Sequence, residues 1–180
     1  MSIGTAMAEL AEAASRVDES TLEPVVRAIC SARRTMLYGC GREGLMMRAL
    51  AMRLHHLGLE VCMQGDMTAF PLGPQDLFLC SAGPGSLSTA SALCRIARAA
   101  DARVLVVTAE PEGETSTLAD ELLVIPAQTM ARDVGNPSVL PMGSLFEGAM
   151  FVVFEVLVLR VRDALGETAD SMRERHTNME

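Results

Sequence analysis

The apolar residues of the first 34 positions recur every three or four residues, whereas those that follow cluster in short continuous runs. The helical spacing over residues 6–17 and 22–33 predicts two helices, separated by the polar run at residues 18–21. The continuous runs end at glycine or polar residues, which is typical of buried strands. They predict five strands, at residues 35–39, 61–63, 76–81, 103–108 and 121–125.

Helical patterns separate these strands, at residues 45–57, 88–100 and, as a short helix, 115–120. An irregular stretch follows at residues 126–141, and then a long apolar helix at residues 144–165. Strands that alternate with helices favour a parallel sheet with right-handed crossovers. We therefore expect an α/β fold, a three-layer doubly wound five-stranded parallel sheet whose ligands bind at the carboxyl ends of the strands.

The chain length of 180 residues fits a single domain. We divide it into N-terminal helices (residues 1–34), an α/β core (residues 35–142), and a C-terminal helix with a charged tail (residues 143–180). The core is expected to be aliphatic, because 49% of the residues are hydrophobic and only 3% are aromatic.

The net charge of −8 argues against sequence-independent binding of nucleic acid, which needs a surplus of Lys and Arg. Five cysteines without a C-x-x-C pair favour buried, reduced thiols and a cytoplasmic location. The N-terminus has no signal-peptide pattern. The most apolar stretch, residues 149–159, is too short to cross a membrane, so no membrane partner is expected.

The first glycine-rich loop joins the strand at residues 35–39 to the next helix and reads Tyr-Gly-Cys-Gly-Arg-Glu-Gly. Gly39 and Gly41 allow a tight turn and a close backbone approach, and free N–H groups there can bind a ligand. Arg42 adds a forked donor for a phosphate or carboxylate. Taken alone, the pattern equally fits a tight turn with an exposed arginine.

The second glycine-rich loop follows the strand at residues 76–81 and reads Ser-Ala-Gly-Pro-Gly-Ser-Leu-Ser-Thr. Its hydroxyls lie at a helix N-terminus, which suits an anion, although Ser86 or Ser88 equally serves as a helix cap. Two such loops at one edge of a parallel sheet converge on one crevice. We therefore expect one small-molecule site built from both loops, with Ser81, Gly83 and Gly85 among its residues.

Glu147 opens the long apolar helix, and two interpretations of it stand side by side. Ser144 and Glu147 have the spacing of a capping box, in which the carboxylate binds a backbone N–H. A carboxylate among apolar residues is also a candidate base with a raised pKa. His56 and His176, taken alone, fit structural roles, since histidine is common near helix C-termini. No grouping of residues has the spacing of a metal site, and no cofactor is expected.

Several stretches of the chain resemble the sugar isomerase (SIS) domain family and, within it, the 6-phospho-3-hexuloisomerases. They are GCGREG at residues 39–44, AMRLHHLG at residues 51–58, the second glycine loop, LPMGSLFE at residues 140–147 and RERHTNME at residues 173–180. The resemblance extends over nearly the whole chain, in the same order. It implies a flavodoxin-like sheet and a tetramer whose active sites lie between subunits.

The resemblance also implies an activity. It is the interconversion of 3-keto and 2-keto hexose 6-phosphates through an enediol, without a metal or cofactor. Glu147 matches the base proposed for the family, and His56 matches the histidine proposed to assist it. The two glycine loops, with Arg42, Glu43 and Ser88, and His176 of the closing motif are then expected to bind the sugar phosphate.

The chain departs from the family pattern in both loops. Glu43 replaces a serine of the first loop, so that an acidic side chain lies where an anion would bind. Residues 82–87 read Ala-Gly-Pro-Gly-Ser-Leu where the family has S-G-S-G-E-T, and two serines and a threonine are therefore missing. The alternatives are a non-catalytic sugar-phosphate sensor and an isomerase of a different sugar, including one without phosphate.

The helix over residues 149–159 is apolar nearly all round, which is more than one sheet face covers. We therefore expect a homo-oligomer, a tetramer, in which this helix is buried.

Overall fold

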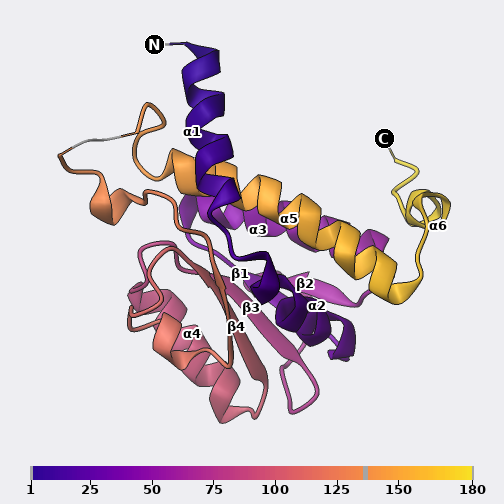
Figure 1. Cartoon of the computed structure of the whole chain (residues 1–180). Helices are drawn as coiled ribbons and strands as arrows, with labels where there is room; N and C mark the ends of the chain where they lie inside the picture. The colour runs from indigo at the N-terminus through magenta and orange to yellow at the C-terminus, as the bar shows by residue number, and fades with distance from the viewer. Residues whose placement is uncertain (1, 136–137, 180) are drawn as a thin grey trace.

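The computed structural model describes residues 2–135 and 138–179. Asn136 and Pro137 of the irregular stretch, and Glu180 of the closing motif, lie outside the described residues. Five parallel strands form one sheet in the order β2-β1-β3-β4-β5 (Figure 1). They are β1 (Thr35–Tyr38), β2 (Val61–Met63), β3 (Leu77–Ser81), β4 (Arg103–Thr108) and β5 (Glu121–Val124).

Helices cover both faces of this sheet, as expected for the three-layer doubly wound fold. One face carries α2 (Leu22–Ser31), α3 (Gly41–His56) and α5 (Ser144–Leu165), and the other carries α4 (Ser88–Ala99) (Figure 1). α1 (Ile3–Ser15) packs on α5 and extends away from the sheet (Figure 1). The short α6 (Ala169–Glu174) contacts α3. Among the described residues no helix has the length and apolar character needed to cross a membrane.

Alternating side chains of the strands supply two hydrophobic cores. Leu77 and Leu79 of β3 face the larger core with α2, α3 and α5, whereas Phe78 and Cys80 face the smaller core under α4. Both sets are almost fully buried, and the core is aliphatic as expected. Because both faces of the strands are covered, the strands read as continuous apolar runs in the sequence.

The sheet order places the topological switch point between β1 and β3. The chain crosses from β1 to one side to form β2, and it returns to the other side for β3, β4 and β5. In this register Tyr38 at the end of β1 lies opposite Cys80 of β3. The loops that leave β1 and β3 therefore separate at the carboxyl edge of the sheet and leave a crevice, where open α/β sheets bind their ligands.

Several boundaries differ from the expectation. α1 begins three residues early and ends two residues early, and α2 ends two residues early. α3 begins at Gly41, four residues early, so that Arg42 and Glu43 lie in its first turn and not in a loop. The predicted helix at residues 115–120 is only a 3-10 turn over Ser116–Leu118. The charged tail contains α6, which begins with a capping box between Thr168 and Ser171. Further 3-10 turns lie at Glu19–Thr21 and Met130–Arg132.

Candidate active site

A cleft of about 360 Å³ opens at the carboxyl edge of the sheet, between the first turns of α3 and α5. Its walls come from the first glycine loop, the second glycine loop, the irregular stretch before α5 and α5 itself. The lining residues are Cys40, Gly41, Arg42, Glu43, Pro84, Leu87, Thr129, Met130, Met142, Gly143, Phe146 and Glu147.

The first glycine loop packs the start of α3 tightly against the sheet. A Cβ atom on Gly39 would lie 2.7 Å from Oγ of Ser81 and 2.9 Å from the backbone of Gly44. A Cβ atom on Gly44 would lie 2.5 Å from the carbonyl oxygen of Gly39. These two positions need glycine because backbone meets backbone there. The contact fixes where the next side chains of α3 enter the cleft.

Arg42 and Glu147 face each other across the cleft. Nη2 of Arg42 lies 2.9 Å from Oε2 of Glu147, and Nη1 of Arg42 donates a hydrogen bond of 2.8 Å to Oγ of Ser144. The capping box expected between Ser144 and Glu147 is wrong. Gly143, in a left-handed conformation, is the residue before the helix, and the Ser144 hydroxyl turns to Arg42.

Glu147 is a nearly buried carboxylate, with 9% of its surface exposed. Burial raises its pKa above the ordinary value, and the positive charge of Arg42 opposes this shift. A carboxylate whose pKa is raised in this way accepts a proton more readily than an exposed glutamate does, which favours a role as a general base.

Glu43 neither points away from the cleft nor pairs with Arg42. Its Oε2 accepts a hydrogen bond of 3.0 Å from the N–H of Gly83 in the second glycine loop. Burial raises the pKa of Glu43, the Gly83 N–H opposes this, and the charge of Glu147 adds to it. The cleft therefore holds two carboxylates and one guanidinium.

The second glycine loop contributes less to the cleft than expected. Only Pro84 and Leu87 of this loop line it. Gly85 packs against the chain after β4, where an added Cβ would lie 2.5 Å from Cβ of Glu110. The hydroxyl of Ser86 accepts a bond of 2.9 Å from the N–H of Glu114. α4 begins with Leu87 as its N-cap, without a side-chain cap, so the capping role expected for Ser86 or Ser88 is wrong.

His56 and His176 lie at the opposite end of α3. Their rings are 5.1 Å apart, and they line a separate hollow of about 250 Å³ with residues of α6. Arg42 and His56 are separated by about 20 Å along the helix, at about 1.5 Å per residue. Within one chain the structure thus brings Glu147 together with Arg42 and Glu43, but not with either histidine.

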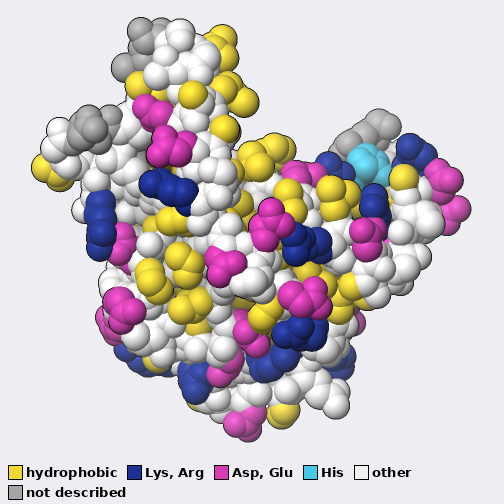
Figure 2. Space-filling model, in the orientation of Figure 1, with side chains coloured by type: hydrophobic (Ala, Val, Ile, Leu, Met, Phe, Trp, Pro, Cys, Tyr) yellow, Lys and Arg dark blue, Asp and Glu magenta, His cyan; other side chains and the backbone are white. Residues whose placement is uncertain are grey.

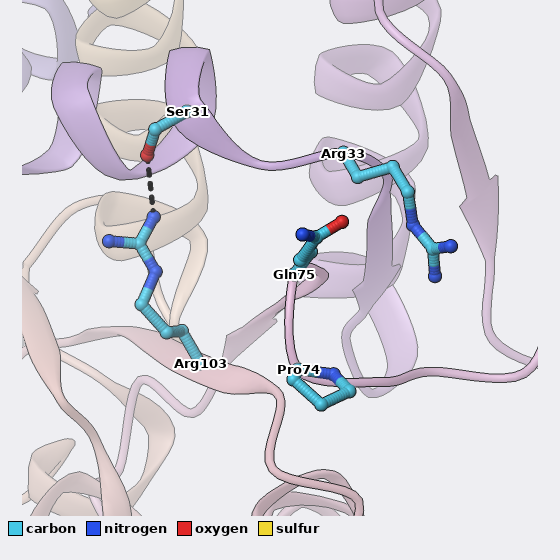
Figure 3. Close-up of a pocket in the computed structure, with 5 residues that line it drawn as sticks. All are labelled: Ser31, Arg33, Pro74, Gln75 and Arg103. Atoms are coloured by element: carbon cyan, nitrogen blue, oxygen red, sulfur yellow. Dashed lines mark hydrogen bonds between the residues drawn. The ribbon is translucent and has the colours of Figure 1, made fainter.

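Another hollow, of about 380 Å³, lies at the amino edge of the sheet (Figure 3). Two arginines flank it, but their donors are used within the protein: Arg103 bonds Ser31, and Arg33 turns away from the hollow to a buried aspartate, Asp76. The carboxyl-edge cleft is therefore the stronger candidate, since ligands of such sheets bind there.

Sequence reasoning missed one polar residue of the cleft, Thr129. This residue is 2% exposed, and within the described part of the chain its hydroxyl has no hydrogen-bond partner. It comes from the irregular stretch, whose composition carries no signal for a site. Among the described residues no group of three or more His, Cys, Asp or Glu side chains is placed to hold a metal ion.

Proteins of known structure share this architecture. A hypothetical protein from Methanococcus jannaschii, whose structure was taken to infer the function of 3-hexulose-6-phosphate isomerase, superposes with a TM-score of 0.84 at 21% identity, over 99% of this chain and 98% of its own. The Vibrio vulnificus NanR protein complexed with ManNAc-6P superposes with a TM-score of 0.77 at 22% identity, over 95% of this chain and 64% of its own. The fold is that of the sugar isomerase (SIS) domain proteins.

Proteins of similar sequence show to which family of SIS domain proteins the chain belongs. The 3-hexulose-6-phosphate isomerase of Mycobacterium gastri is 34% identical over 172 residues, which cover 96% of this chain and 86% of that enzyme. The enzyme of the same name from Methylomonas aminofaciens is 31% identical over 159 residues, covering 88% and 87%. No protein-family model matches the chain. The chain belongs to the 3-hexulose-6-phosphate isomerase family.

Proposed function

We propose that this protein is a sugar-phosphate isomerase that interconverts a 3-keto and a 2-keto hexose 6-phosphate. Membership of the family supports this activity, and the nearly buried Glu147 in the cleft is the observation that carries the mechanism. The base removes the proton from C2 of the 3-keto sugar and the carbonyl oxygen O3 gains a proton, which gives an enediol between C2 and C3. Return of a proton to C3, with loss of the hydroxyl proton at O2, leaves the carbonyl at C2.

In this mechanism Glu147 carries the proton between the two carbons. Its pKa, raised by burial, suits a group that must both accept and release a proton. Arg42, 2.9 Å from Glu147, supplies a positive charge beside the enediolate oxygens as negative charge develops there.

The variant Glu147→Gln tests this proposal, because glutamine keeps the shape but cannot take the proton. We expect isomerisation to fall by about 10²–10⁴-fold with little change in melting temperature. Glu112→Gln, in an exposed turn, is the matched control and should retain activity. An active Glu147→Gln enzyme would exclude this base. Wild-type protein that binds the sugar phosphate but exchanges no carbon-bound proton with deuterated water would indicate a sensor.

We further propose that the active unit is a homo-oligomer, a tetramer, in which His56 reaches the cleft of a neighbouring subunit. Exposed apolar side chains of α1 and α5 support this, and Figure 2 shows hydrophobic side chains gathered over these helices. They are Ile3, Met7, Phe151, Val152, Val156 and Leu159. Burial of such side chains against a second copy is favourable.

Five free cysteines support a reducing, cytoplasmic location.

Mixing of two inactive variants tests the shared site. Glu147→Gln and His56→Asn subunits, unfolded together and refolded as mixed oligomers, should recover part of the wild-type activity. The recovery is expected because some sites then combine an intact Glu147 with an intact His56 from the neighbour. The same variants refolded separately are the control. Mixed oligomers without activity, or a monomer in sedimentation at micromolar concentration, would refute the shared site.

A further inference from the structure

The backbone N–H groups of Gly83, Gly85 and Leu87 in the second glycine loop are already bonded within the protein. The acceptors are a carboxylate, a carbonyl and a hydroxyl: Gly83 N–H bonds Oε2 of Glu43 at 3.0 Å, Gly85 N–H bonds the Ala82 carbonyl at 2.8 Å, and Leu87 N–H bonds Oγ1 of Thr115 at 3.1 Å. Pro84 has no N–H to offer. A loop that binds a phosphate does so through free N–H groups, and these positions have none to give.

The Glu43 carboxylate also fills the space in front of the loop. A Cβ atom on Gly83 would lie 2.8 Å from Oε1 of Glu43 and 2.8 Å from the ring of Phe146. The position of Glu43 is set by the first turn of α3, which the contact between Gly39 and Gly44 holds against the sheet. The carboxylate of Glu43 is therefore bound to the Gly83 N–H, the donor that an anionic ligand would otherwise use.

The charges of the cleft also make the position in front of Gly83 unfavourable for a phosphate. The guanidinium of Arg42 is engaged with Glu147, so that it does not neutralise Glu43. A phosphate at the loop would meet a like charge at contact distance, which is unfavourable at a binding site. A sugar hydroxyl, in contrast, can donate a hydrogen bond to a carboxylate oxygen.

We propose that Glu43 is a specificity-determining residue that excludes the phosphate from the N–H of Gly83 and keeps this end of the cleft for an uncharged, hydroxyl-bearing part of the sugar. The inference rests on the proposed function, since it takes the ligand to be a hexulose phosphate. The phosphate of that ligand then binds away from the N–H of Gly83.

Inorganic phosphate is the probe, and the amide resonance of Gly83 in NMR spectra of the full chain is the readout. In the wild type we expect phosphate at neutral pH to leave this resonance in place. In Glu43→Ser, which removes the charge and frees the Gly83 N–H, phosphate should shift the resonance. The apparent affinity should be at least about tenfold higher, because a like-charge contact is removed.

Two further variants distinguish the effect of the negative charge of Glu43 from the effect of its side-chain size and from a general effect of removing a glutamate. Glu43→Asp keeps the charge on a shorter side chain, and it should still exclude phosphate. Glu112→Ser removes a glutamate from an exposed turn, and it should behave as the wild type does. A phosphate-dependent shift of Gly83 in the wild type, or its absence in folded Glu43→Ser, would overturn the proposal. The wild-type titration decides the matter even if the variant does not fold.

The titration does not depend on turnover, so failure of this inference is distinguishable from failure of the proposed function. Wild-type protein without isomerase activity on hexulose phosphates would refute the function. A shifted Gly83 resonance in an active wild type would refute only the role of Glu43.

Discussion

Asp76 joins the amino edge of the sheet to the preceding loops, and its replacement by asparagine should destabilise the protein in a pH-dependent way. The side chain is fully buried. It accepts hydrogen bonds from Nε and Nη2 of Arg33 at 3.0 and 2.9 Å, from Nη2 of Arg34 at 3.2 Å and from the N–H of Gly73 at 2.9 Å. The bonds from Arg33, followed by those from Arg34 and Gly73, lower the pKa of Asp76 from 3.8 to about 2.

The lowered pKa of Asp76 gives the size of its contribution to the folding free energy and the direction in which this contribution changes with pH. A pKa lowered from 3.8 to about 2 corresponds to about 2.5 kcal/mol of folding free energy, at about 1.4 kcal/mol per pKa unit. The folded pKa lies below the unfolded one, so this stabilisation is present above pH 3.8 and is lost as the pH falls towards 2. Asparagine has no carboxylate, and the variant should lack the contribution at every pH.

Urea denaturation of wild type and Asp76→Asn at pH 7 and pH 3 measures this difference. At pH 7 the variant should be less stable by about 2.5 kcal/mol, with a melting temperature lower by about 5–10 °C. At pH 3 the difference should be smaller. Asp170→Asn is the control, because this side chain is 86% exposed and its ion pair contributes at most about 1 kcal/mol. An equal loss of stability at both pH values would refute the reasoning.

Three other predictions concern the cleft. Arg42→Ala removes the charge that lowers the pKa of Glu147, so the acid limb of kcat/KM against pH should move to higher pH; an unmoved limb would contradict this. Gly83→Ala places a methyl group against Glu43 and should cost about 1–3 kcal/mol in thermal denaturation. Gly4→Ala should not destabilise, because the nearest atom to its added Cβ is Oγ of Ser2 at 3.7 Å, an ordinary contact. Ser144→Ala should cost less than the roughly 1 kcal/mol of a lost helix cap, because its hydroxyl binds Arg42.

Local patterns in the sequence determined the elements and their order. The helix at residues 144–165 begins and ends as predicted, since its apolar run and the following glycine act within a few residues. The alternation of strands and helices also predicted the parallel sheet and the edge where the cleft lies. The start of α3 was missed because two of its first four residues are glycine, which is a poor helix former.

The partners of the polar side chains were decided by the tertiary structure alone. The spacing of Ser144 and Glu147 predicted a capping box, yet Arg42, 102 residues before Ser144, takes the hydroxyl instead. Glu43 bonds Gly83, 40 residues away, and so changes what the second glycine loop can bind. Each such bond depends on which groups the packed helices bring within about 3 Å of each other. Local periodicity carries no information on that distance, so the chemistry of the cleft follows from packing.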